Sequence, residues 1–382
     1  MKTIKDILSD GFWIMPSTPQ FIEGGEIPYI TSKNIKIGNI DFSNVQYISK
    51  EDFEEISKNR PIKVNDMLIS MIGTLGNIAI VKETDGSFYG QNMYLLRLNS
   101  DVIDRDYFYH FFNSDVVKRH IESKKNKSTQ GYLKANHIEE IAIPVPSMEE
   151  QKEIASHFEA INSLIDARKS QLDKLDLLVK SRFIEMFGTV ENNVFGYPVK
   201  TIGDVATLKS GTSLPSDVEN EGGNIPYVKV GDMNYQGNEY YITTSSRYVS
   251  EKTAGKGLFE IGTVIFPKRG GAIGTNKKRL TKLPICADLN VMGVTPNKSI
   301  ILPSYLMSYF ELVDLGSLDN GSSVPQINNK DIAPLQICIP PIDLQNQFAE
   351  FVEQTDKLKF EVKEALEKLE TLKKSLMQQY FG

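Results

Sequence analysis

The chain has 382 residues, of which 40% are hydrophobic and 24% charged, and its formal net charge at pH 7 is -6. This length fits two to three domains of ordinary globular composition, and the acidic balance argues against a simple nucleic-acid binder. No apolar run approaches the roughly 18–20 residues of a membrane span, no signal segment is evident and only two cysteines occur, so we expect a cytoplasmic protein without disulfides.

Residues 1–147 are expected to form a first globular domain. Segments 67–72 and 78–81 are typical of strands on either side of a glycine turn. Helical patterns occur at about 50–58 and 104–120.

Residues 148–190 are expected to form one long helix, and residues 342–382 a second. In each, apolar residues recur at steps of four and three, no Pro or Gly interrupts the pattern, and a proline precedes the start. Such spacing over about five heptads predicts a coiled-coil spacer in which the two helices pack on each other. Its seam comprises Ile154, Phe158, Ile161, Ile165, Leu172, Leu175 and Val179 in the first helix and Phe348, Val352, Val362, Leu366, Leu369 and Leu376 in the second.

A second apolar line runs beside this seam. A two-stranded coil needs one seam only, so the extra line indicates either helices supplied by a partner or a widened core seam. Its members are Leu164, Leu178, Phe183, Leu358 and Leu372.

Residues 191–341 are expected to form a second globular domain. Segment 263–266 is the counterpart of strand 67–72, and a helical pattern covers 303–315. The sequence therefore predicts an α+β protein with two similar mixed α/β domains, whose strand order stays open.

The two halves of the chain repeat each other. Lys2 and Thr3 recur as Lys200 and Thr201, an offset of 198, and Phe187 recurs as Phe381 after the offset has shortened to 194. The stretches between the repeated positions differ, as 36–62 do from 234–259. Similar scaffolds that carry dissimilar loops would read two different short sequences.

Catalytic motifs are missing from the sequence. It contains no Walker loop, no Gly-x-Gly-x-x-Gly, no His-Glu-x-x-His and no Asn/Asp-Pro-Pro-Tyr, and its four histidines lack the spacing of a zinc site. We therefore expect a chain that recognises a partner, is not itself an enzyme, and holds no metal and no cofactor.

Candidate contacts to double-stranded DNA lie in glycine-flanked turns and basic clusters at corresponding places in both repeats. Glycine permits close approach of the backbone, while cations and amides suit phosphates and base edges. Solvated connecting loops are the alternative interpretation. The candidates are Lys33, Thr74, Asn77, Lys124, Lys125, Lys127, Thr129 and Gln130 in the first repeat and Lys229, Lys268, Arg269, Lys277, Lys278, Arg279, Ser322, Ser323 and Gln326 in the second.

This organisation resembles the specificity (S) subunit of type I restriction-modification systems. The resemblance covers essentially the whole chain and rests on two domains that are each followed by a long helix, with Ile-Pro-Tyr near each start. Segments 146–154 and 340–348 are similar to the family's proline-to-helix junction, and Ser210-Gly211-Thr212 to its Ser-Gly domain start. Ser9-Asp10-Gly11 departs from that start in the first repeat.

The resemblance implies a division of labour. Each target-recognition domain would bind one half of a bipartite, asymmetric DNA target, and an antiparallel coiled coil would fix the spacing with pseudo-twofold symmetry. Methyltransferase (M) subunits, two in number, would supply S-adenosylmethionine and adenine methylation. Restriction (R) subunits would supply ATP- and Mg-dependent cleavage.

Two other functions remain open from the sequence. One is the recognition subunit of a related multisubunit restriction enzyme that cuts outside its site. The other is a scaffold that binds no DNA, in which the coiled coil joins two protein-binding modules.

Overall fold

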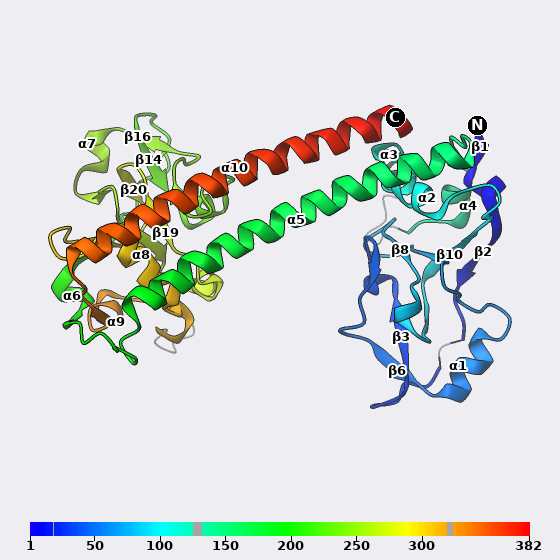
Figure 1. Ribbon diagram of the computed structural model, residues 1–382, viewed down its shortest axis with the longest axis horizontal. Coiled ribbons are helices and arrows are strands. Elements are labelled where there is room, and N and C mark those ends of the chain that lie inside the picture. The colour runs from blue at the N-terminus through cyan, green and yellow to red at the C-terminus, as the bar shows by residue number, and fades with distance from the viewer. Residues whose placement is uncertain (18, 125–131, 319–323) are drawn as a thin grey trace. The chain divides into compact units, whose positions relative to one another are not determined.

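The computed structural model describes residues 1–382 except 18, 125–131 and 319–323 (Figure 1). The chain divides into two compact units, and each takes a part of both long helices. Unit 1 consists of Met1–Arg168 and Ala365–Gly382, and unit 2 of Lys169–Glu364. The units therefore cut across the four predicted segments, because the beginning of one helix and the end of the other pack on the same globular domain.

The two long helices form where the 4-3 spacing predicts them. Helix α5 spans Met148–Phe187 and α10 spans Ile342–Phe381, with forty residues each. At the start of α5, Glu150 accepts hydrogen bonds from the Ser147 backbone N–H (2.9 Å) and hydroxyl (2.7 Å). These bonds lower the pKa of the Glu150 carboxyl, and its negative charge favours the helix N-terminus.

Unit 1 is built from two main sheets. The first is antiparallel with the strand order β2-β10-β7-β8, and the second has the order β6-β3-β9, in which β3 and β9 are parallel. The predicted strands around the glycine turn are thus confirmed as β7 and β8. The strands are β1 (Lys2–Thr3), β2 (Leu8–Ile14), β3 (Ile27–Thr31), β4 (Ile35–Lys36), β5 (Asn39–Ile40), β6 (Gln46–Ile48), β7 (Met67–Ser70), β8 (Ile78–Ile80), β9 (Tyr89–Gln91), β10 (Met93–Leu98) and β11 (Ala142–Ile143).

Short helices cover these sheets. The helical pattern predicted at 104–120 becomes two helices, since the chain turns at Asn113 and Ser114. The helices of unit 1 outside the long pair are η1 (Ile4–Ile7), η2 (Ser32–Asn34), α1 (Lys50–Ser57), η3 (Glu83–Asp85), α2 (Arg105–Phe112), α3 (Asp115–Lys124) and α4 (Ala135–Glu139).

Unit 2 repeats this plan with one more strand in each of the two sheets. Its main sheet has the order β13-β21-β18-β19-β15, where β15 pairs parallel to β19, and its second sheet has the order β16-β14-β20-β17. The predicted segment 263–266 is confirmed as β18. The strands are β12 (Val199–Thr201), β13 (Ala206–Ser210), β14 (Ile225–Val228), β15 (Tyr241–Ile242), β16 (Tyr248–Val249), β17 (Leu258–Phe259), β18 (Val264–Pro267), β19 (Arg279–Thr281), β20 (Ile285–Ala287), β21 (Val291–Pro296) and β22 (Gln336–Cys338).

The helices of unit 2 include the one predicted at 303–315. It forms as α8, with a proline at its first position. The set is α6 (Ile202–Val205), η4 (Val230–Asn234), α7 (Glu251–Ala254), η5 (Gly255–Gly257), η6 (Gly270–Thr275), α8 (Pro303–Leu312), η7 (Leu315–Leu318) and α9 (Asn329–Ile332).

A buried glutamine fastens each long helix to its domain in the same way. The side chain of Gln151 accepts from the Asp104 N–H (2.8 Å) and donates to the carbonyls of Val102 (3.1 Å) and Pro146 (2.9 Å). Gln345 makes the three corresponding bonds in unit 2, to Leu302, Ile300 and Pro340. Because a buried amide needs partners for both of its ends, this repeated arrangement fixes the direction in which each helix leaves its domain.

The last phenylalanine of each long helix lies in the core of a domain that the helix does not follow in sequence. Phe381 of α10 packs on Tyr107 (5.4 Å between ring centroids) and Phe158 (5.8 Å) in unit 1. Phe187 of α5 packs on Tyr305 (4.8 Å) and Phe348 (5.5 Å) in unit 2. Each unit thus holds the beginning of one long helix against the end of the other.

The two predicted apolar lines of the long helices differ in exposure. Every residue of the main seam is buried or half-buried. In the second line Phe183 belongs to the core of unit 2, whereas the four leucines are 47–50% exposed: Leu164, Leu178, Leu358 and Leu372. A wider core seam therefore accounts for Phe183 and leaves the leucines without a burial partner in the described chain.

Candidate nucleic-acid interface

The glycine turn of unit 1 joins β7 to β8. Thr74 is exposed at its tip, and its carbonyl accepts a hydrogen bond from the Ser70 hydroxyl. Asn77 is half-buried and donates through Nδ2 to the Ile35 carbonyl (3.1 Å). Of these two candidates, Thr74 therefore faces solvent, while the side chain of Asn77 holds β4 beside the turn.

The basic run at the start of β19 points in two directions, because successive side chains of an extended chain alternate. The Nζ of Lys277 donates to Asn234 Oδ1 of η4, and one Arg279 nitrogen donates to the Met233 carbonyl (3.1 Å). Lys278, between them, is 2% exposed and faces the segment after α8. The sequence predicted a cationic surface here, and the structure gives all three cations acceptors within the protein.

Lys268 and Arg269 lie at the end of β18 and differ in their surroundings. Lys268 is buried, and its Nζ donates to the Ser210 hydroxyl (2.8 Å). Arg269 is exposed, and its backbone forms an antiparallel bridge to Gln326. Gln326 is half-buried and donates to Asn328 Oδ1 (2.8 Å). Arg269 is thus the cation of this basic cluster whose charge reaches solvent most freely.

Burial has a direct electrostatic consequence for the two internal lysines. Loss of water around the ammonium groups lowers the pKa of Lys268, to which the nearby Arg269 charge adds a smaller effect. Desolvation likewise lowers the pKa of Lys278, against an opposing attraction to Glu311 and Asp314. These groups are poorly suited to phosphate contact in the described conformation.

The remaining candidates are spread over both units. Lys33 in η2 and Lys124 at the end of α3 are exposed. Lys229 is half-buried and ion-paired to the buried Glu219, with its ammonium 5.7 Å from the Tyr227 ring centre. Six candidates lie outside the described residues: Lys125, Lys127, Thr129, Gln130, Ser322 and Ser323.

Asn276 is not among the candidate DNA contacts, although it supports this region. Asn276 has a left-handed backbone (φ 52°), and its Oδ1 accepts from both Lys278 Nζ (2.8 Å) and the Leu315 N–H (2.9 Å). The asparagine after Gly-Thr is a weak signal for such a turn, since asparagine tolerates positive φ better than most residues.

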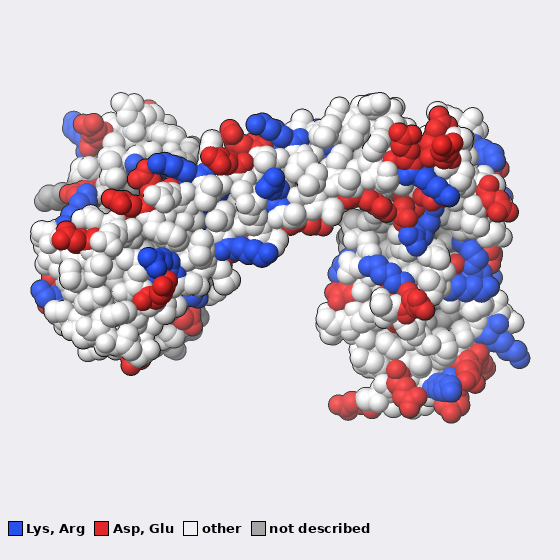
Figure 2. Space-filling view, viewed as in Figure 1, with Lys and Arg blue, Asp and Glu red and all other residues white. Residues whose placement is uncertain are grey.

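Surface charge is mixed on the face of each unit that Figure 2 shows, with acidic and basic side chains interspersed. Within the described ranges, no group of three or more His, Cys, Asp and Glu side chains is arranged to hold a metal ion. None of the described helices is both long and apolar enough to cross a membrane.

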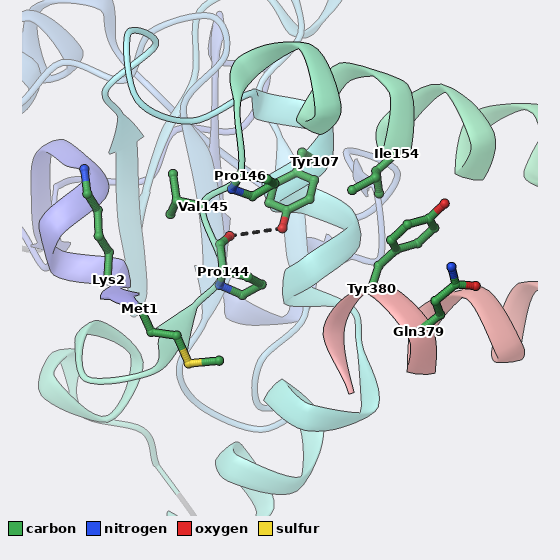
Figure 3. A pocket seen from close by; sticks show the side chains of 9 residues that line it. All are labelled: Met1, Lys2, Tyr107, Pro144, Val145, Pro146, Ile154, Gln379 and Tyr380. Atoms are coloured by element: carbon green, nitrogen blue, oxygen red, sulfur yellow. Dashed lines mark hydrogen bonds between the residues drawn. The ribbon is translucent and has the colours of Figure 1, made fainter.

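A groove lies where α5 leaves the domain of unit 1 (Figure 3). It has a volume of about 510 Å³, and Tyr107 in its wall donates to the Pro144 carbonyl (3.0 Å). Figure 3 shows Ile154 and Tyr380 on one side of it and Lys2, the one lining residue with a charged side chain, on the other. A groove of about 410 Å³ lies at the corresponding junction in unit 2. Apolar side chains and prolines make up most of the lining of both grooves.

Comparison with known proteins agrees with the resemblance seen in the sequence. The family model of the type I restriction modification DNA specificity domain matches residues 1–177 and 196–373. The type I restriction enzyme MjaIX specificity subunit of Methanocaldococcus jannaschii is 26% identical over 386 residues, which is 92% of this chain and 85% of the relative.

Two solved structures share the fold. A chain from a type I R-M system, studied for complex assembly and conformational transition, has a TM-score of 0.62 at 18% identity, with 99% of this chain and 96% of that chain covered. The type I S subunit from M. genitalium has a TM-score of 0.57 at 16% identity, with 100% and 95% covered. The predicted resemblance is confirmed: this chain belongs to the type I restriction-modification DNA specificity family, whose members are the non-catalytic DNA-recognition subunits of these systems.

Proposed function

We propose that each domain reads one half of a bipartite, asymmetric DNA target and that α5 and α10 together set the distance between the halves. The observation that carries this proposal is the repeated frame with unlike loops. Gln151 and Gln345 make matching bonds, whereas the glycine turns on the two domains carry different side chains. A frame of this kind presents two different readers in equivalent positions.

An antiparallel coiled coil is the proposed spacer. Its support is the reciprocal packing at the helix ends, where Phe158 near the start of α5 contacts Phe381 at the end of α10. In unit 2, Lys359 of α10 pairs with Asp176 of α5 (2.6 Å). Forty residues at 1.5 Å per residue give a helix on the order of 60 Å, which spans nearly two turns of a DNA duplex.

Two methyltransferase subunits are the proposed partners on these helices. Leu164 and Leu358 occupy equivalent positions, as do Leu178 and Leu372, and all four are exposed. Apolar side chains repeated on a helix surface favour burial by another protein. The pair of junction grooves adds a second feature that occurs once in each unit. The S-adenosylmethionine, ATP and Mg²⁺ of the reaction would be bound by the methyltransferase and restriction subunits.

The exposed candidates, and not the buried ones, are the residues that we propose to contact DNA. They are Lys33, Thr74 and Lys124 in unit 1 and Arg269 in unit 2. Three cations are few for a tight duplex binder, so the methyltransferase subunits are expected to supply much of the phosphate contact.

A domain exchange tests the assignment. Residues 1–147 are replaced by the first domain of another family member, the chain is co-expressed with its methyltransferase, and N6-methyladenine is mapped in the host DNA. We expect one half of the methylated motif to change and the other to persist. The matched control exchanges residues 191–341 and should change the opposite half.

Two outcomes would contradict the proposal. If either exchange altered both halves together, one domain would not correspond to one half. If the native complex methylated no bipartite sequence, the chain would not act as a two-part reader.

A further inference from the structure

In unit 2 two loops that are distant in sequence form one continuous surface, which we call the ridge. It consists of residues 268–278, 313–318 and 324–327. The Gly270 N–H donates to the Pro325 carbonyl (2.8 Å), and the Ile327 N–H donates to the Lys268 carbonyl (2.9 Å). These backbone hydrogen bonds join the two loops at one end of the ridge.

Lys278 joins the two loops at the other end of the ridge. Its Nζ donates to Asn276 Oδ1 (2.8 Å) in the first loop and to the Val313 carbonyl (2.7 Å) in the second. Asn276 Oδ1 in turn accepts from the Leu315 N–H (2.9 Å). A single ammonium group and a single amide therefore tie the glycine loop to the segment after α8.

The fold alone gives little reason for a lysine at this position. Lys278 is 2% exposed, and the acceptors of its two hydrogen bonds are neutral. The attraction of Glu311 and Asp314 does not outweigh its loss of water, which lowers the pKa of Lys278. A buried charge whose desolvation is not offset is costly, and an apolar side chain of similar volume often serves stability equally well. What the lysine adds is direction, because its two hydrogen bonds fix where the loops lie relative to each other.

In unit 1 an apolar contact, in place of a buried lysine, supports the equivalent glycine turn. The equivalent backbone bridge joins Ile72 to Tyr132, and the Leu133 N–H donates to the Met71 carbonyl (3.1 Å). There the glycine turn rests on α3, so that a Cβ on Gly76 would lie 2.7 Å from Ile121 Cδ1. The bridge is thus common to both units, while the internal support of the turn is specific to each.

The outer face of the ridge is open. A Cβ at Gly271 or Gly274 would meet nothing within 4 Å, and neither residue has a positive φ that would require glycine. Arg269 and Thr275 are exposed beside them. Lys278 therefore supports the inner side of the loop. The outer side carries glycine, the Arg269 guanidinium group and the Thr275 hydroxyl, which donates to the Ala272 carbonyl of the same loop (2.6 Å).

We propose that Lys278 is a positioning residue for sequence recognition by unit 2, because it holds the ridge in the shape that meets the DNA. This inference rests on the proposed function of the domains as readers of separate half-targets. Lys278 itself does not touch DNA in this assignment; it acts through Asn276 and the second loop.

The test uses the assembled methyltransferase complex with Lys278→Met, which keeps the volume and removes the donors. Methylation of the native target is compared with targets that carry single base changes in either half. We expect the ratio of kcat/KM between native and changed targets to fall about tenfold for the unit 2 half and to stay constant for the unit 1 half. A side chain that served folding alone would not move this ratio in one half only.

Two further variants sharpen the test. Asn276→Gly suits the left-handed backbone and removes the shared acceptor, so it should reproduce the effect. The double variant should be no worse than either single variant, since both break one network. Lys252→Met, at an exposed lysine of α7, is the matched control and should leave both ratios unchanged.

Melting temperature separates recognition from folding. If Lys278→Met lowered the melting temperature and left both ratios unchanged, or reduced both equally, the positioning role would be overturned and the proposed function would stand. If the native complex showed no bipartite preference at all, the proposed function itself would fail.

Discussion

Unit 1 and unit 2 make matching contacts where their domains hold the long helices. Elsewhere in the two domains, equivalent positions carry different side chains. The Tyr107 hydroxyl donates to the Pro144 carbonyl (3.0 Å), and Tyr305 donates to Cys338 in the same way (2.8 Å). Away from the helices, matched positions carry different chemistry. The frame is thus constrained by a common task, and the remainder of each domain has diverged.

One matched pair in the main sheets illustrates this divergence. In unit 1 the buried Asp66 accepts two hydrogen bonds from Arg97 (2.8 and 2.7 Å). At the equivalent places in unit 2, Thr263 and Thr295 share a single hydroxyl hydrogen bond (2.9 Å). The same pair of neighbouring strands is therefore held by a charge pair in one unit and by a neutral contact in the other.

The shared frame predicts the largest effect. Phe187→Ala removes a fully buried ring that contacts Tyr305 and Phe348, so we expect unit 2 to lose about 3–5 kcal/mol of unfolding free energy. Phe381→Ala should do the same to unit 1. Hydrogen exchange with peptide resolution measures the two units separately. Phe195→Ala, at a half-exposed ring, is the control and should cost less than about 1 kcal/mol. If it lowered the unfolding free energy as much as the other two variants, the buried rings at the helix ends would not be specially important for stability.

Breaking the ion pair comes next. Asp66→Ala leaves Arg97 without its main partner in a largely buried place, and we expect a loss of about 3 kcal/mol. Thr263→Val, the matched change in unit 2, removes two neutral hydrogen bonds, one with the Thr295 hydroxyl and one to the Glu260 carbonyl, and should cost about 1–2 kcal/mol. Urea unfolding of the two variants gives the comparison. Equal losses would mean that the two contacts contribute alike despite their different charge.

The units should also respond differently to acid. Burial lowers the pKa of His110 to about 4, and the Lys373 charge acts in the same direction, against Asp106 and Asp104. An unfolded histidine titrates near 6.5, so protons bind the unfolded chain first and stability is lost as pH falls from 6.5 towards 4. Between pH 7 and 5 the loss is about 2 kcal/mol.

Unit 2 carries the buried Ser308 at the position equivalent to His110 and lacks this contribution. His110→Ser should therefore flatten the acid dependence of unit 1, whatever its effect on stability at pH 7. Hydrogen exchange of unit 1 peptides at pH 7 and 5 measures the slope. An unchanged slope would assign the acid sensitivity to other groups.

Periodic features were the ones that the sequence could predict. The 4-3 spacing located α5 and α10 to within three residues, because a long helix depends on contacts between near neighbours. The order of the strands was out of reach, since β2 pairs with β10 across most of the domain. No local pattern specifies such a pairing.

The candidate DNA contacts show the same limit at single residues. The run of Lys277, Lys278 and Arg279 is a cationic cluster in sequence, and two of its acceptors are the backbone carbonyls of Val313 and Met233. Carbonyl groups of distant segments leave no trace in side-chain patterns. Arg269 lies two residues beyond the end of β18 and is exposed, whereas its neighbour Lys268 is buried, a difference that the sequence did not predict.

The smallest predicted difference concerns two equivalent glycines. Gly76 has a φ of +78°, and its added Cβ would press on Ile121, so Gly76→Ala should cost about 1–2 kcal/mol. Gly274, its counterpart, lacks a positive φ and has open space around it, so Gly274→Ala should change stability by less than about 0.5 kcal/mol. Thermal unfolding of the two variants makes the measurement. If both variants lost the same stability, the turn of unit 2 would need its glycine for folding. The glycine on the open face of the ridge would then give no reason to infer a binding partner outside the chain.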